Sequence, residues 1–171
     1  MRFFSLLLAG LLVLAACDTG YDTQTTGSSA SGLSTKVYRI RQGDTSKVQY
    51  RMLDSVNALR SAAGAPPVKL DARLNAASAT HSRDMSVQNR PWHFGSDGSS
   101  PLDRVQRAGY DGAMLGENIS ETYETELETL AAWMEEPGTR SVILEKRAVN
   151  MGFAWYQEPN GKIWWTLIMG G

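Results

Sequence analysis

The stretch Leu115-Gly116-Glu117-Asn118-Ile119 is the point from which the fold of this chain can be worked out. A charged glutamate lies there between a glycine and an asparagine, and apolar residues flank the three. This alternation predicts a short, half-buried strand, in which Gly116 lets a neighbouring group approach closely. A carboxylate buried in that strand needs a partner, because an unpaired buried charge costs several kcal/mol. We expect the partner in Trp92-His93-Phe94, so that His93 and Glu117 form one site.

Three helices are predicted before this strand. The first follows the cap residues 43–46 and ends before Gly64, and its apolar residues recur at helical spacing. The second begins after Asp71, which is a good N-cap residue. The third runs from Leu102 to Ala108, after the N-cap and N1 pair Ser100-Pro101.

A fourth helix and a hairpin are predicted after the strand. Thr122 or Thr125 caps the helix, whose buried face is predicted to consist of Leu127, Leu130, Ala131 and Met134. Its acidic first turns are interpreted as a solvated face. The segments Val149–Gln157 and Lys162–Met169 are predicted to pair across a turn at Asn160-Gly161. The second of these strands is apolar on both faces, which predicts a central position in an antiparallel sheet between helical layers, and hence an α+β domain.

The N-terminus has the features of an exported lipoprotein. Residues 1–16 have a basic start, an apolar run and a small-residue end, which is typical of a signal peptide. The apolar run is shorter than the roughly 20 residues that a membrane span needs. Cys17 directly follows Leu-Ala-Ala, as in a bacterial lipobox, and is predicted to be lipidated. Residues 17–35 are then a flexible tether, and residues 36–171 the folded domain, whose first residues, Lys36 to Arg41, are either a short strand or the end of the tether.

Composition excludes several classes of function. The chain has 1 Cys and a formal net charge of −1. With Cys17 lipidated, no disulfide, thiolate nucleophile or Cys-based zinc site is left. A near-neutral chain also lacks the broad basic face that nucleic acid requires.

Several motifs in order resemble a known family. They are Val56-Asn57-Ala58-Leu59-Arg60, Leu70-Asp71, His81-Ser82-Arg83-Asp84-Met85, His93, Asp97-Gly98-Ser99-Ser100-Pro101, Asp103-Arg104, Gly116-Glu117-Asn118-Ile119, Trp133-Met134, Pro137-Gly138 and Trp164-Trp165. In this order the chain resembles the bacterial branch of the CAP superfamily, the SCP-like or pathogenesis-related-1-like domain. The resemblance implies an α-β-α sandwich with a central antiparallel sheet.

The resemblance also implies a cavity lined by two histidines and two acidic residues, which hold a divalent metal in some members. Carried over, these positions are His93, Glu117, Glu136 and, in place of the second histidine, Thr139. One imidazole with two carboxylates and a hydroxyl is a poor zinc site. His81 is expected to be a core histidine. We therefore predict a cavity for an organic ligand, with no resident metal and no cofactor.

Three functions remain open from the sequence. The favoured one is a non-catalytic binding module for a small molecule, lipid or cell-wall fragment, with Trp92 and Phe94 at the rim of the cavity. The second is a hydrolase of peptides or envelope polymers that uses His93 and Glu117. The third is an envelope interaction protein that works through its acidic helix, around Glu124 to Glu128. In each case we expect attachment to the membrane through the lipid on Cys17, on the periplasmic side, and we make no prediction of the oligomeric state.

Overall fold

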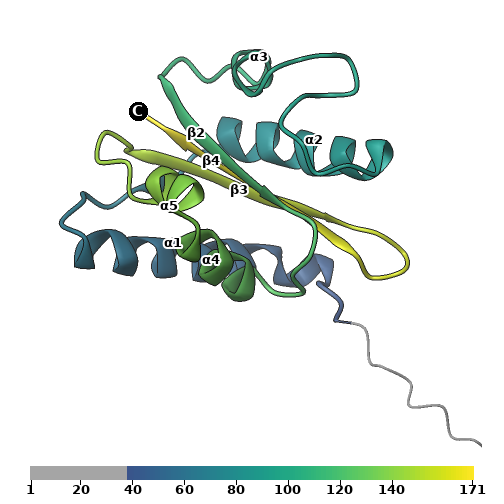
Figure 1. The fold of residues 1–171 in the computed structure, drawn as a ribbon, viewed down its shortest axis with the longest axis horizontal. Coiled ribbons are helices and arrows are strands. Elements are labelled where there is room, and N and C mark those ends of the chain that lie inside the picture. Colours follow the sequence, from purple (N-terminus) through teal and green to yellow (C-terminus); the bar gives the residue numbers. More distant parts are fainter. Residues whose placement is uncertain (1–37) are drawn as a thin grey trace, which may run out of the picture. The chain divides into compact units, whose positions relative to one another are not determined.

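Helices cover both faces of a four-stranded sheet in the computed structural model, which describes residues 38–171 (Figure 1). The predicted signal peptide, Cys17 and tether lie outside the described residues. The first described residues, from Tyr38 to Arg41, form no strand. The Gln157 side chain holds them instead, because it donates to the carbonyl of Tyr38 and accepts from the amide of Ile40.

The sheet has the strand order β1-β3-β4-β2. Its strands are β1 (Lys69–Leu70), β2 (Met114–Ser120), β3 (Asn150–Gln157) and β4 (Ile163–Gly170). The three long strands pair antiparallel, as predicted, and β4 lies inside the sheet with every residue buried. The short strand β1 was missed, and it pairs with β3 in parallel. Two residues carry too little periodicity to be recognised as a strand in a sequence.

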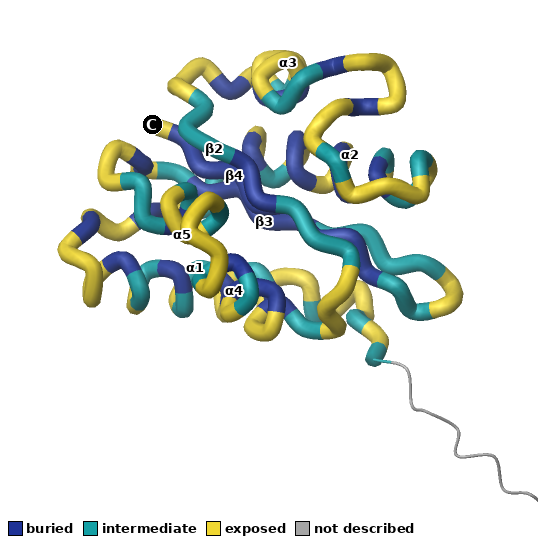
Figure 2. The backbone as a smooth tube through the Cα atoms, viewed as in Figure 1, coloured by how far each residue is buried: buried dark blue, intermediate teal, exposed yellow. Residues whose placement is uncertain are grey.

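Helices α1 (Thr45–Ala62), α4 (Glu126–Glu135) and α5 (Pro137–Ile143) cover one face of the sheet (Figure 1). A 3-10 turn, η1 (Gln42–Asp44), leads into α1. This layer contains the larger core, in which the rings of Phe153 and Trp165 stack 5.6 Å apart. Buried backbone runs through β3 and β4 beneath these helices (Figure 2).

Helices α2 (Ala72–Gln88) and α3 (Pro101–Arg107) cover the opposite face (Figure 1). A smaller core forms here, from Leu74, Ala77, Val105, Tyr110 and Ile168. The backbone of α2 lies directly on β3, since a Cβ added at Gly152 would come within 2.3 Å of the carbonyl carbon of Leu74. The glycine therefore sets the distance between this helix and the sheet.

The buried face of α4 differs from the prediction. Thr125 is the cap, in a capping box with Glu128, and the buried residues of the helix are Glu126, Thr129, Leu130 and Trp133. Leu127 is 42% exposed, and Ala131 is exposed as well. Glu126 pairs with Arg51 of α1 at 2.5 Å, so one member of the acidic run is buried and not solvated. The ion pair with α1 thus accompanies a buried face that keeps Leu130 of the predicted residues and exposes Leu127 and Ala131.

Candidate functional site

Glu117 is placed by β2, an edge strand of the sheet. Along a strand, neighbouring side chains point to opposite faces. Asn118 donates to the carbonyl of Thr139 in α5 at 2.9 Å, whereas Glu117 contacts α3 and the loop before it. The Glu117 side chain is only 2% exposed. Glu117 is therefore a buried carboxylate on the α2–α3 side of the sheet, and it needs the partners described next.

Arg104 of α3 is the main partner of this carboxylate. Its Nη2 donates to Oε1 of Glu117 at 3.0 Å and to Oε2 at 2.8 Å. Its Nη1 donates to the carbonyls of His93 and Ser99 at 2.9 and 3.3 Å. Helix α3 positions Arg104 because its start is fixed by a capping box between Ser100 and Asp103. Arg104 thus pairs with Glu117 and holds the backbone of the loop that carries His93.

His93 lies in that loop, and its Nδ1 is 2.9 Å from Oε1 of Glu117. The contact predicted between these two residues is confirmed. The loop is attached to the last turns of α2, where the Asp84 carboxylate accepts from the backbone and hydroxyl of Ser96. Gln88 adds to this attachment by donating to Asp84 and accepting from the Trp92 indole. The loop therefore presents His93 in one orientation.

The hydrogen bonds around Glu117 determine the tautomer of His93. Both carboxylate oxygens accept from Arg104, so Glu117 acts as the acceptor and the Nδ1 of His93 carries the hydrogen. The neutral ring then offers the lone pair of Nε2, and its side chain is 50% exposed. A half-exposed imidazole held in this way can accept a hydrogen bond from a ligand, take up a proton or coordinate an ion.

His81 lies beneath this pair and is fully buried, as expected of a core histidine. Its Nε2 is 3.7 Å from Oε1 of Glu117, which is too long for a hydrogen bond. Neither ring nitrogen has a hydrogen-bond partner among the described residues. Burial lowers the pKa of His81, although the Glu117 carboxylate opposes this effect. His81 is therefore a neutral ring that excludes water from the inner side of Glu117.

The other two predicted site residues, Glu136 and Thr139, lie at the junction of α4 and α5. The Thr139 hydroxyl donates to the carbonyls of Trp133 and Glu136 at 2.7 and 3.2 Å. Glu136 is exposed, and within residues 38–171 neither residue hydrogen-bonds to the side chain of His93 or Glu117. The same part of the chain holds no group of three or more metal-ligating side chains in a suitable arrangement. A role for Glu136 and Thr139 in ligand binding remains a prediction.

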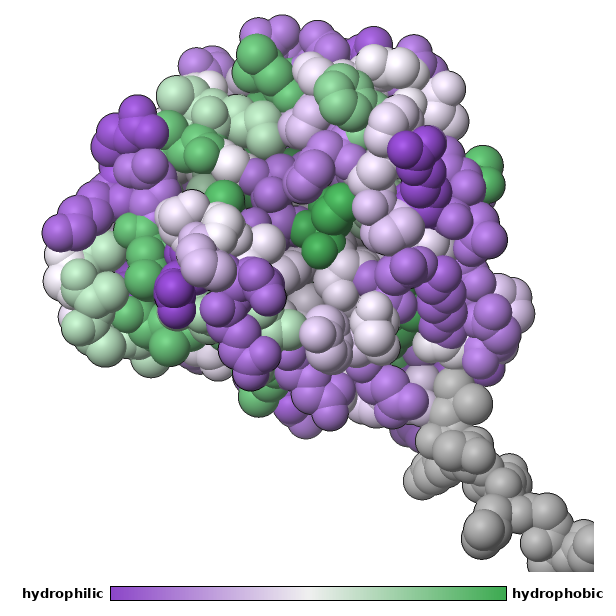
Figure 3. Space-filling view, in the orientation of Figure 1, coloured by the Kyte–Doolittle hydropathy of each residue, from purple (hydrophilic) through white to green (hydrophobic). Residues whose placement is uncertain are grey.

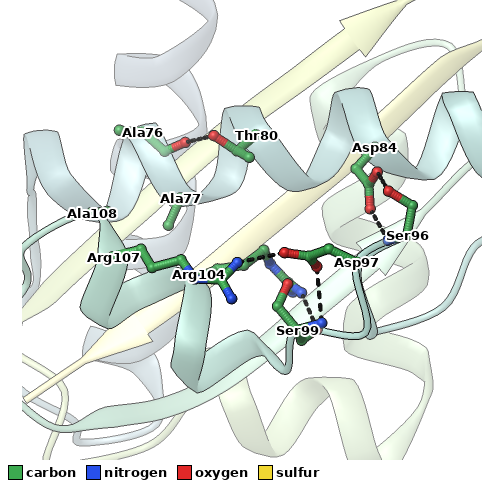
Figure 4. Close-up of a pocket in the computed structure, with 10 residues that line it drawn as sticks. All are labelled: Ala76, Ala77, Thr80, Asp84, Ser96, Asp97, Ser99, Arg104, Arg107 and Ala108. Carbon is green, nitrogen blue, oxygen red and sulfur yellow. Dashed lines mark hydrogen bonds and ion pairs between the residues drawn. The ribbon is translucent and has the colours of Figure 1, made fainter.

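The aromatic residues predicted for the rim lie on either side of His93. The rings of Trp92 and Phe94 are 5.4 Å apart, and Phe94 is 46% exposed. A pocket of about 410 Å³ lies further along, between α2 and the segment from Ser96 to Ala108 (Figure 4). Arg104 lines this pocket, whereas His93 and Glu117 do not. Of the His–Glu pair only His93 is half-exposed, and the cavity is a separate feature that shares Arg104 with the pair.

Sequence reasoning missed the role of Arg104. It predicted a partner for the Glu117 carboxylate, but it considered only His93. The sequence did contain one signal. Arg104 lies four residues before Ala108, so in the short helix α3 the two residues are on the same face of the helix. Nothing in the sequence indicates that this face packs beside β2.

Comparisons with known proteins agree with this fold. The protein called YkwD of Bacillus subtilis (strain 168) is 28% identical over 149 residues, which are 86% of this chain and 57% of that protein. This chain therefore spans less than two thirds of that relative. Two solved structures each have a TM-score of 0.66. An outer surface protein from Borrelia burgdorferi is 15% identical over 74% of this chain and 94% of its own. An extracellular protein containing a SCP domain from Bacillus anthracis str. Ames is 21% identical over 77% of this chain and 44% of its own.

The family itself is established by a sequence profile. The profile described as CAP, cysteine-rich secretory protein family, matches residues 53–169. This match begins within α1, ends at the last residue but one of β4 and includes every residue of the site described above. Because it extends over more than half of the chain, the protein belongs to the CAP family.

Proposed function

We propose that this protein is a binding module of the bacterial cell envelope, which holds an organic ligand at His93 and carries out no reaction of its own. One observation carries the proposal. The Nδ1 of His93 is engaged by Glu117, whereas its Nε2 has no hydrogen-bond partner among the described residues. The exposed Phe94 beside it offers apolar area. A fixed polar acceptor next to an aromatic surface is typical of a ligand site.

A hydrolase that uses His93 and Glu117 is the second candidate, because a histidine oriented by a carboxylate is the usual arrangement of a general base. Such an enzyme also needs a nucleophile within hydrogen-bond reach of the histidine. The hydroxyl of Ser96 donates to Asp84 at 2.6 Å, and that of Ser100 donates to Asp103 at 2.7 Å. No described serine donates to His93, and this favours binding over covalent catalysis.

An interaction protein that works through its acidic helix has less support. Glu126 is buried against Arg51, so the acidic run presents fewer free charges than its sequence indicates. On the face drawn in Figure 3, apolar side chains lie in small groups among hydrophilic ones. Stable protein interfaces have an apolar centre, and small separated groups do not supply one.

Attachment to the membrane through a lipid on Cys17 is part of the proposal. Among the described residues, no helix is long and apolar enough to span a membrane. The relatives named above include an outer surface protein and an extracellular protein. The test is metabolic labelling with an alkyne fatty acid. We expect Cys17→Ala to lose the label, and a label that persists in this variant would contradict the anchor.

The binding proposal can be tested with the imidazole signals of the full-length protein, because the chain has only 2 His. Purified soluble cell-wall fragments and a short-chain phospholipid are titrated separately, and the ¹⁵N resonances of both rings are followed. We expect one of the two to shift the Nε2 resonance of His93 saturably. His93→Ala should abolish binding, while the exposed control Tyr50→Ala on α1 should leave it unchanged.

Two results would contradict the proposal. If neither class of molecule shifts His93, the ring holds no envelope ligand. If a fragment is instead cleaved, and Glu117→Gln stops the cleavage, the protein is the hydrolase of the second candidate.

A further inference from the structure

The pocket between α2 and α3 is separate from the His93–Glu117 pair and is unaccounted for by the function proposed above. Its volume of about 410 Å³ lies within the usual range for ligand sites. Small side chains of Ala76, Ala77 and Thr80 line it from α2, and Ala108 lines it from the end of α3 (Figure 4). The pocket therefore has a mainly apolar floor of small side chains between two helices.

Arg104 forms part of the wall of this pocket and is 5% exposed. Its two terminal nitrogens are used by Glu117, His93 and Ser99. Its Nε has no hydrogen-bond partner among the described residues. An unpartnered buried donor is costly, and in native proteins it calls for a partner such as a water or a ligand. Arg104 therefore lines the pocket and pairs with Glu117, so it connects the two sites.

The two ends of the pocket carry opposite charges. Asp84 lies at one end and Arg107 toward the other (Figure 4). Within residues 38–171, the Oδ1 atom of Asp84 accepts from the hydroxyl of Ser96 alone, so it has capacity for another donor. Arg107 uses one nitrogen in an ion pair with Asp97, and its side chain is 63% exposed. Exposed ion pairs of this kind add little to stability, so a ligand carboxylate can replace Asp97 as the partner of Arg107 at little cost.

The length of the pocket limits the ligand. Along α2 the eight steps from Ala76 to Asp84 rise by about 12 Å, at 1.5 Å per residue. A fully extended chain advances by roughly 3.4 Å per residue, so a tripeptide is about 10 Å long. Its terminal ammonium and carboxylate groups can then reach Asp84 and Arg107, while small side chains face the alanine floor.

From this charge pattern and length we propose that the α2–α3 pocket binds a short zwitterionic peptide of about three small residues. The ammonium group binds Asp84, and the carboxylate binds Arg107. The site does not depend on whether His93 holds a ligand of its own. Because Arg104 also bonds to Glu117 and to the His93 carbonyl, occupancy of the pocket changes the environment of the His93 ring.

The test is calorimetry on the full-length protein with Ala-Ala-Ala, followed by the same peptide with an acetylated N-terminus or an amidated C-terminus. We expect saturable binding of the free tripeptide and at least tenfold weaker binding of each blocked form. Ala76→Trp should fill the pocket and abolish binding. Its control is Ala79→Trp, at an exposed residue of α2 that does not line the pocket. Arg107→Gln should weaken the free peptide at least tenfold and leave the amidated peptide unchanged.

Absence of saturable binding would overturn the proposal, as would equal affinity for the free and blocked peptides. Binding that survives Ala76→Trp would overturn it too, because the peptide would then occupy another surface. The His93 titration described above uses cell-wall fragments and a phospholipid, whereas the calorimetry measures the heat of peptide binding to the pocket, so either proposal can fail alone.

Discussion

Removing the charge of Glu117 tests whether the buried ion pair organises the site. In Glu117→Gln the carboxamide keeps its shape but faces Arg104 and the Nδ1 of His93 with only one acceptor oxygen. The side chains of Glu117 and Arg104 are 2% and 4% exposed, so water cannot solvate the guanidinium that is left without a counter-charge. Breaking a buried pair by removing one partner costs about 3–5 kcal/mol. We expect about 3 kcal/mol here, because the remaining oxygen still accepts one hydrogen bond.

Urea unfolding measures this loss through tryptophan fluorescence, since Trp133, Trp164 and Trp165 are all buried. A loss of about 3 kcal/mol should lower the thermal midpoint by about 12 °C, at about 4 °C per kcal/mol for a domain of this size. The matched control is Glu136→Gln, an exposed glutamate of the predicted site, which should change stability by less than about 0.5 kcal/mol.

A double-mutant cycle separates the pair from the general loss of packing. Replacing both partners, in Arg104→Met with Glu117→Gln, removes the uncompensated charge. We expect the double variant to be more stable than the sum of the two single losses predicts, by about 2 kcal/mol. Additive losses, or a Glu117→Gln variant as stable as the parent, would refute the reasoning that this pair is the centre of the site.

Further predictions concern the core around the site. Because burial lowers the pKa of His81, the unfolded chain binds a proton that the folded chain does not, and stability falls as the pH drops below about 6.5. In the variant His81→Gln, the urea midpoint should depend less on pH between pH 7 and 5 than it does in the parent protein. An unchanged pH dependence would assign the effect to other titratable groups. Gly152→Ala should cost about 3 kcal/mol or more, because its Cβ would meet the backbone of Leu74 at 2.3 Å. The control is Gly43→Ala, whose new Cβ has no atom within 4 Å and should leave stability unchanged. Equal losses of stability in the two variants would contradict the close approach of Leu74 to Gly152. Arg60 is fully buried and donates to four backbone carbonyls, so Arg60→Met should cost about 3 kcal/mol or more, and a loss below about 1 kcal/mol would show that these carbonyls find other partners.

Local sequence signals were sufficient for most of the elements. The caps at Asp71 and Ser100 start α2 and α3 as predicted, because an N-cap depends only on the residues of its own first turn. The hairpin of β3 and β4 followed from two apolar segments around an Asn-Gly turn. The His93–Glu117 contact was also predicted, since a buried carboxylate requires a partner and few candidates were available.

The sequence by itself therefore determined the order and type of the long elements and the need for a partner to Glu117. Only the tertiary structure decided that Arg104 is the main partner and that Glu126 is buried against Arg51. It also separated Thr139 from Glu117, because Asn118, the next residue of β2, is the one that contacts α5. The physical reason is the distance along the chain over which each signal acts. Caps and periodicity act within a few residues, whereas an ion pair or a pocket depends on which faces of distant helices the sheet brings together.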